Sequence, residues 1–175
     1  MFRKEILMIL GGLMVVCAAS VEGQILWIET GHYIWTDDHP YYTEVFLQND
    51  ATLNFVGGSM RKLSTLDNSV ANLNGGEMMN LWAMGNSVVH YHSRELDYIS
   101  ASHSSVVYLY AYDVTYDPVG GINQAGYVEG LFYDNDEPFG FSCWNVPTWE
   151  HIEIVPEPAT LALLGFGALL IRKRN

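Results

Sequence analysis

The chain has 175 residues, enough for one domain, and 49% of them are apolar, which supports a buried core and excludes an intrinsically disordered protein. Residues 24–157 hold 18 of the 20 acidic residues but only three basic ones, so this body carries a formal charge of −15. Nucleic acid is excluded as a partner because phosphate binding needs a clustered basic surface. Two cysteines, Cys17 and Cys143, are too few for a disulfide framework.

The N-terminus has the pattern of an export signal. Arg3 and Lys4 precede an uncharged apolar stretch over residues 6–17, and the segment 18–23 that follows contains small residues, Ala18, Ala19, Ser20 and Gly23, where a signal peptidase could cut. We therefore expect a signal peptide over 1–23. A permanent membrane anchor is the weaker alternative, because the apolar stretch is shorter than the roughly 20 residues that span a bilayer.

At the C-terminus, a proline-containing motif is followed by an uncharged, mostly apolar segment over 159–171 and then by a basic tail. The motif consists of Val155, Pro156, Glu157 and Pro158, and the tail of Arg172, Lys173 and Arg174. A helix over the apolar segment would be about 20 Å long, shorter than the ~30 Å hydrocarbon core of a bilayer. This arrangement resembles the PEP-CTERM sorting signal of exported proteins in Gram-negative bacteria.

The resemblance implies an address for the protein. In that family an exosortase in the inner membrane recognises the motif and processes the protein on its way to the cell surface or extracellular matrix, commonly alongside exopolysaccharide production. The implied partners are the exosortase, the export machinery, the inner membrane during sorting, and exopolysaccharide. The positive-inside rule leaves the basic tail in the cytoplasm and the motif at the opposite face, so a membrane-anchored intermediate with a short transmembrane helix is expected.

Between the two terminal signals, a repeat of period 18 runs without a gap from Ala51 to Tyr116. Aligned repeats give four columns that are apolar almost throughout, and polar residues alternate with them, as in strands. The columns are Leu53, Ala71, Val89 and Val107; Phe55, Leu73, Tyr91 and Leu109; Met60, Met78, Leu96 and Val114; and Leu63, Leu81 and Ile99. This pattern predicts an all-β protein built on a parallel β-solenoid of three to four coils, each burying its inward side chains against its neighbours.

The segments that flank the repeat are expected to cap it, covering sheet edges that would otherwise aggregate. A hairpin is predicted over 127–133 and 139–145, with a further strand over 149–154. The chain is thus divided into a signal peptide (1–23), an N-terminal cap (24–50), the solenoid (51–116), a C-terminal β cap (117–154) and the sorting signal (155–175), with hydrophobic targeting helices at both termini.

Two groups of residues are candidate metal ligands. His90 and His92 are two positions apart, so on a strand both imidazoles lie on one face, as two ligands of a metal would. The repeat also aligns Glu77, Glu95 and Asp113, which would stack carboxylates about 4.8 Å apart and repel one another unless solvent or calcium intervenes. We favour an exposed polar face for the histidines and a solvated corner for the acids, and we expect no cofactor.

Tyr108, Tyr110 and Tyr112 share one face of a predicted strand. Such a row serves either as a platform on which sugars stack or as a surface that packs against a cap, and we favour the cap. Asn68 and Asn86 fall in one column of the repeat, and their amides are expected to hydrogen-bond along the stack.

No motif in the chain points to catalysis, and the β-helical polysaccharide lyases and hydrolases are far longer than this protein. We therefore expect no enzyme, but an exported structural protein of the cell surface or extracellular matrix. A module that binds glycan or exopolysaccharide is the alternative. Ice binding is less favoured, because it needs a flat array of threonines, whereas Thr52, Thr65 and Thr115 fall in unrelated columns.

Overall fold

The computed structural model describes residues 7–8, 24–92 and 96–156. Within them the chain forms β-strands and two short 3-10 helices. The elements are β1 (Leu7–Met8), β2 (Ile25–Ile28), β3 (His32–Trp35), β4 (Glu44–Leu47), β5 (Thr52–Phe55), β6 (Ser59–Thr65), β7 (Val70–Leu73), β8 (Glu77–Ala83), β9 (Val88–Tyr91), β10 (Tyr98–Ala101), β11 (Val106–Leu109), β12 (Ala111–Asp117), η1 (Ile122–Gln124), β13 (Tyr127–Phe132), β14 (Pro138–Cys143), η2 (Val146–His151) and β15 (Ile152–Ile154).

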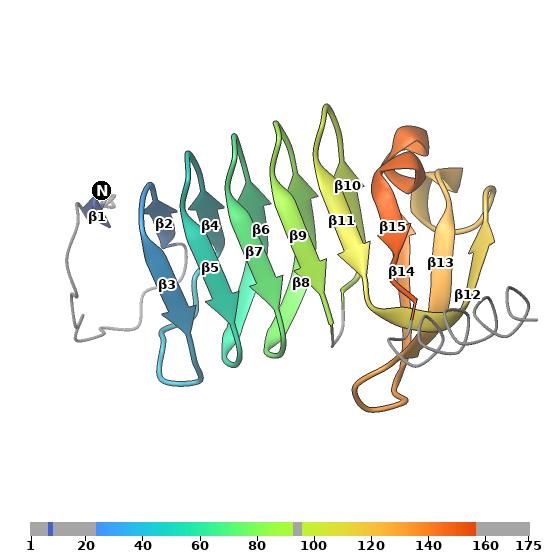
Figure 1. The fold of residues 1–175 in the computed structure, drawn as a ribbon, viewed down its shortest axis with the longest axis horizontal. Helices are drawn as coiled ribbons and strands as arrows, with labels where there is room; N and C mark the ends of the chain where they lie inside the picture. Colours follow the sequence, from blue (N-terminus) through green and yellow to red (C-terminus); the bar gives the residue numbers. More distant parts are fainter. Residues whose placement is uncertain (1–6, 9–23, 93–95, 157–175) are drawn as a thin grey trace, which may run out of the picture.

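The strands form a β-solenoid of about five coils, each of which gives one strand to each of two sheets (Figure 1). Sheet A has the order β1-β2-β4-β6-β8-β10-β14-β13-β12, and sheet B has the order β15-β11-β9-β7-β5-β3. Neighbouring coils pair in parallel, as between β7 and β9 and between β6 and β8. The prediction of an all-β protein whose coils follow a period near 18 is confirmed.

The apolar columns of the repeat fill the space between the sheets. Leu53, Ala71, Val89 and Val107 lie level with one another on β5, β7, β9 and β11 and are all fully buried. The columns that begin at Phe55, Met60 and Leu63 are buried as well, except at Val114. Each coil therefore buries its inward side chains against the same positions of the next coil, which is what the period of the repeat predicts.

The solenoid begins earlier than the repeat indicates. The segment 24–50, which we expected to form a cap, supplies the first coil, β2 and β3, and the first strand of the second coil, β4. Strand β2 pairs in parallel with β4, and β3 pairs in parallel with β5. Leu26 pairs with Val45, and Tyr33 pairs with Leu53, so these partners are one and two positions farther apart than in the later coils. A search at a fixed period of 18 therefore misses the first coil, whereas the second already follows the period, as Val45 and Leu63 show.

The solenoid also ends before the repeat does. The repeat runs to Tyr116, but β12 leaves the stack and pairs with β13 in antiparallel orientation, while β14 takes the place beside β10. Val114 consequently does not lie over Leu96 in a further coil, as the alignment of their column predicted, and Asp113 lies on β12 outside the stack. The hairpin of β13 and β14 and the last strand, β15, lie where we expected a C-terminal β cap.

Side-chain hydrogen bonds on the outside of the stack and close contacts at its turns also join successive coils. Asn86 Nδ2 donates to Asn68 Oδ1 at 3.2 Å, which confirms the expected amide ladder. At the turn after β7, Gly76 lies close to the Phe55 ring of the preceding coil. Its φ is +81°, and a Cβ there would clash with Phe55 Cζ. Glycine is therefore required at this turn.

The expected targeting helices fall almost wholly outside the described residues. Of the residues in 1–23, the structure places β1, a two-residue strand that pairs in parallel with β2, where a helix was expected. Across the described parts of the chain, no helix is both long and apolar enough to cross a membrane. The apolar segment 159–171 lies outside those parts.

Candidate functional site

The sorting motif begins immediately after the last strand of sheet B. Strand β15 pairs with β11, and the Val155 amide donates to the Leu109 carbonyl oxygen at 2.9 Å. Pro156 is exposed and is the last described residue. The other predicted motif residues, Glu157, Pro158, Arg172, Lys173 and Arg174, lie outside the described part of the chain. The motif thus follows the folded body without an intervening linker.

His90 and His92 lie on the outer face of sheet B, as predicted, but each faces an aromatic ring of the next coil. The His92 ring stacks on Tyr110 with 3.8 Å between centroids, and the His90 ring stacks on Tyr108 at 5.3 Å. His90 Nδ1 also hydrogen-bonds the Tyr110 hydroxyl at 2.9 Å. His92 Nδ1 lies 3.6 Å from Asp134 Oδ2 in the loop between β13 and β14. These contacts join the last coils to the C-terminal hairpin.

Among the described residues, the acidic candidate ligands do not come together with the histidines. Glu77 is exposed on β8 in sheet A, whereas the two histidines come from β9 and its following turn in sheet B. Asp113 lies on β12, which β14 and β13 separate from β10, and Glu95 lies outside the described residues. No cluster of three or more His, Cys, Asp or Glu side chains that could hold a metal ion occurs among the residues that the structure describes.

The three tyrosines of the predicted row, for which packing against a cap was expected, have neighbours on their ring faces. Tyr108 and Tyr110 stack on the two histidines. Tyr112 stacks on Tyr133 with 5.5 Å between centroids and an interplanar angle of 16°, and its hydroxyl donates to Asp136 Oδ1 at 2.7 Å. The Tyr112 ring therefore stacks on the C-terminal cap, whereas the rings of Tyr108 and Tyr110 stack on the preceding coil.

Sequence reasoning missed an aromatic row on the outer face of sheet A. Trp27 stacks on Phe46 at 4.0 Å, and Trp82 lies 6.2 Å from Trp144. The intervening position, Ser64, is fully buried although it lies on the outer face. On the two strands next to Trp82, the equivalent positions are serines, Ser64 and Ser100, and not aromatic residues. These interruptions hid the column from a search for repeated residue types.

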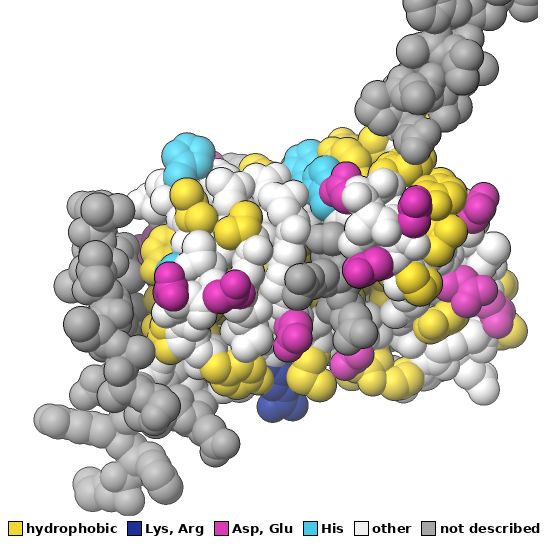
Figure 2. Space-filling view, turned by 90° about the horizontal axis from the view of Figure 1, so that it is seen from below, with side chains coloured by type: hydrophobic (Ala, Val, Ile, Leu, Met, Phe, Trp, Pro, Cys, Tyr) yellow, Lys and Arg dark blue, Asp and Glu magenta, His cyan; other side chains and the backbone are white. Residues whose placement is uncertain are grey.

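A cation covers the middle of this row. Lys62 Nζ lies 3.9 Å from the centroid of Trp82 and 2.5 Å from Glu44 Oε1. Arg61 and Lys62 are the basic residues of the described part. In Figure 2 the Lys and Arg side chains accordingly appear at one place on the lower margin, while Asp and Glu are spread over the face. A lysine held by both an aromatic face and a carboxylate stabilises the sheet surface.

The histidine contacts predict how stability depends on pH. Burial lowers the pKa of His90, and for His92 burial lowers the pKa while the Asp134 carboxylate raises it to a smaller extent. Since the folded pKa lies below the unfolded value of about 6.5, the unfolded chain takes up protons first on acidification. We expect the melting temperature to be constant above that pH and to fall as the pH drops below about 6.5.

The matched variant is His90→Asn, because asparagine occupies the equivalent position in the two preceding coils, Asn54 and Asn72. Its melting temperature should fall less steeply over the same pH range. A melting temperature that rises on acidification, in either protein, would contradict the direction assigned to these pKa values.

Comparison with known proteins finds one match, and it concerns the C-terminal segment. Residues 155–174 match the family model of the PEP-CTERM protein-sorting motif. No curated protein and no solved structure matches the chain. The protein is thus an all-β solenoid by its fold. Its motif indicates an exported protein that is processed by an exosortase and sorted to the cell surface.

Proposed function

We propose that the protein is a structural component of the cell surface or the extracellular matrix, that it reaches this place through a membrane-anchored intermediate, and that it catalyses no reaction. The sorting motif at residues 155–174 carries the proposal. The body to which the motif is attached is compatible with a structural role, because its core is filled by stacked apolar columns. A solenoid of this kind is held by contacts between neighbouring coils alone.

The outer surface supports this role better than a ligand-binding role. Sugars bind aromatic side chains through the ring faces, and in this protein the faces of Tyr108 and Tyr110 are stacked on histidines. The amide ladder of Asn68 and Asn86 likewise uses its polar groups between coils. We therefore place glycan or exopolysaccharide binding second, and an association with exopolysaccharide follows from the address of the protein and not from these rings.

Processing at both ends is the expected result that tests the proposal. The protein recovered from the cell surface should begin near Gln24 and be altered near Pro156–Pro158, because both terminal segments match targeting signals and not fold elements. Intact-mass and peptide mass spectrometry of protein from cells and from medium measure this directly.

The variant Glu157→Ala should leave the C-terminal peptide in place and reduce the protein at the surface. Its control is Glu153→Ala, an exposed residue of β15 that lies outside the motif, and this variant should be processed like the wild type. Surface-localised protein that keeps both terminal peptides intact would contradict the proposed route.

A further inference from the structure

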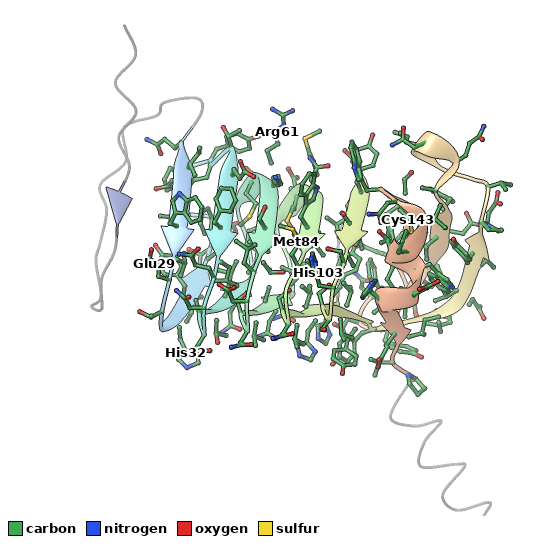
Figure 3. The ribbon with its side chains drawn as sticks, turned by 90° about the horizontal axis from the view of Figure 1, so that it is seen from above. Glu29, His32, Arg61, Met84, His103 and Cys143 are labelled. Carbon is green, nitrogen blue, oxygen red and sulfur yellow. The ribbon has the colours of Figure 1, made fainter. Side chains whose placement is uncertain are left out.

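The N-terminal end of the solenoid presents two strand edges where a cap was expected. Strands β2 and β3 form the first coil (Figure 1). Among the described residues, β3 has no strand on its outer side, and β2 has only the two-residue β1 there. Figure 3 shows Glu29 and His32, from the turn and strand of this coil, at the end of the molecule opposite to Cys143.

The backbone groups that this edge offers can be named. The carbonyls of Gly31 and Trp35 accept from the amides of Thr52 and Val56 on β5 and its following turn. In a parallel ladder successive residues point their backbone groups to opposite sides. The amides and carbonyls of His32 and Ile34 therefore point away from the solenoid. In β2, the carbonyls of Gln24 and Ile28 accept hydrogen bonds from amides beside β4. By the same alternation, the amides and carbonyls of Ile25 and Trp27 point outward.

Strand β1 shows that the edge accepts a partner. Leu7 and Met8 pair in parallel with Leu26 and Trp27, and they belong to the segment that is expected to be removed on export. Once this segment leaves, the edge of β2 is open like that of β3. An open edge with unpaired amides and carbonyls favours pairing with another strand.

The two ends of the solenoid differ in how their edges are protected. Natural edge strands are commonly blunted by bulges, prolines or charged residues. At the C-terminal end, β12 has an irregular register between Tyr112 and Thr115, and it carries Asp113 at a φ of +50° together with Asp117. Neither β2 (ILWI) nor β3 (HYIW) contains an acidic residue, a lysine or a proline, and Ile34 is 60% exposed.

We propose that the exported protein forms a twofold dimer through its N-terminal end, in which β3 of one copy pairs in antiparallel orientation with β3 of the other, and β2 with β2. A second copy fits because both sheets end at the same coil here, so that a twofold axis normal to the sheets pairs both edges at once. The C-terminal end does not fit this edge, because there sheet A continues through β13 and β12 beyond β14, whereas sheet B ends at β15.

Electrostatics allow this arrangement despite the charge of −15 on each body. The two solenoids lie end to end, so that most acidic residues of the two copies are farther apart than the Debye length of about 8 Å at physiological ionic strength. The interface itself is formed by backbone groups and by apolar or uncharged side chains of β2 and β3.

Light scattering after size-exclusion chromatography tests the proposal on the protein purified after export, with its termini checked by mass spectrometry. The wild type should have twice the mass of one chain. Ile34→Pro should have the mass of one chain and an unchanged circular dichroism spectrum, since proline removes an outward amide and no bond to β5. Ile34→Lys is a second variant with the same expected loss of the dimer, in case proline disturbs the fold.

Two controls fix the location of the interface. Val56→Lys adds the same charge at a position that is 48% exposed but lies beyond the end of β5, away from the edge, and it should remain a dimer. With a short thiol crosslinker, Ile34→Cys should give covalent dimers and Val119→Cys, near the opposite end, should not. A monomeric wild type, a dimeric Ile34→Pro variant, a mass above two chains, or linkage through Val119→Cys would overturn the proposal.

Discussion

Leu81→Asp is expected to unfold the protein. Leu81 is fully buried between Leu63 and Ile99 of the neighbouring coils. An unpaired carboxylate at this place costs several kcal/mol, on the order of the total stability of a domain, about 5–15 kcal/mol. Because each coil is stabilised by its neighbours, the loss extends beyond the substituted coil. Circular dichroism and urea denaturation of the purified protein measure the effect.

The matched control places the same carboxylate on the surface. Asn74→Asp lies in the turn after β7 and is exposed, so we expect its free energy of unfolding to stay within about 0.5 kcal/mol of the wild type. Leu81→Ala should lie between the two variants, with a loss of about 2–5 kcal/mol. If the two aspartate variants unfolded at the same denaturant concentration, Leu81 would not be an inward residue of the stack.

Phe132→Ala should cost about 3–5 kcal/mol, the usual loss when a buried aromatic ring is removed from a core. Phe132 is 1% exposed. Its ring meets Tyr91 edge-on at 5.1 Å and lies 4.6 Å from Phe139. It therefore joins the last coils of the solenoid to the hairpin of β13 and β14, and the cavity should weaken this junction most.

Hydrogen exchange distinguishes a weakened junction from a general loss of stability. Amides of β13 and β14 should lose protection first in Phe132→Ala, while those of β5 and β7 stay protected. Val119→Ala serves as the control, because Val119 is 73% exposed and should change stability by less than about 0.5 kcal/mol. Equal loss of protection along the whole solenoid would show that the hairpin and the coils unfold as one unit.

The two ends of the solenoid differ in whether a β cap covers them. The sequence suggested a cap at each end, but within the described residues a β cap follows only the last coil, where β12, β13 and β14 are neighbours. The first coil is formed by β2 and β3 themselves. This asymmetry is the basis for the proposed dimer, because an edge without a bulge or a charged residue pairs readily with its own copy.

The amino-acid sequence by itself determined the parts of this protein that repeat or that are read as linear signals. Each coil of a solenoid places the same positions in the same surroundings, so the columns headed by Leu53, Phe55 and Leu63 could be assigned to the core from the period alone. The amide ladder of Asn68 and Asn86 followed from the same period. The sorting motif at 155–174 was found from its residues because it needs no fold to be recognised.

Only the tertiary structure decided where the repeat stops being a solenoid and which side chains meet. Strand alternation is the same in parallel and antiparallel pairing, so residues 111–116 kept the pattern of a coil although β12 pairs with β13. The first coil was hidden because its strands are one or two residues farther from those of the second coil than the period of 18 requires. The contact of His92 with Asp134 and the contact between the Trp82 and Trp144 rings join residues that are distant in the chain. Such pairs are set by the packing of the hairpin against the coils.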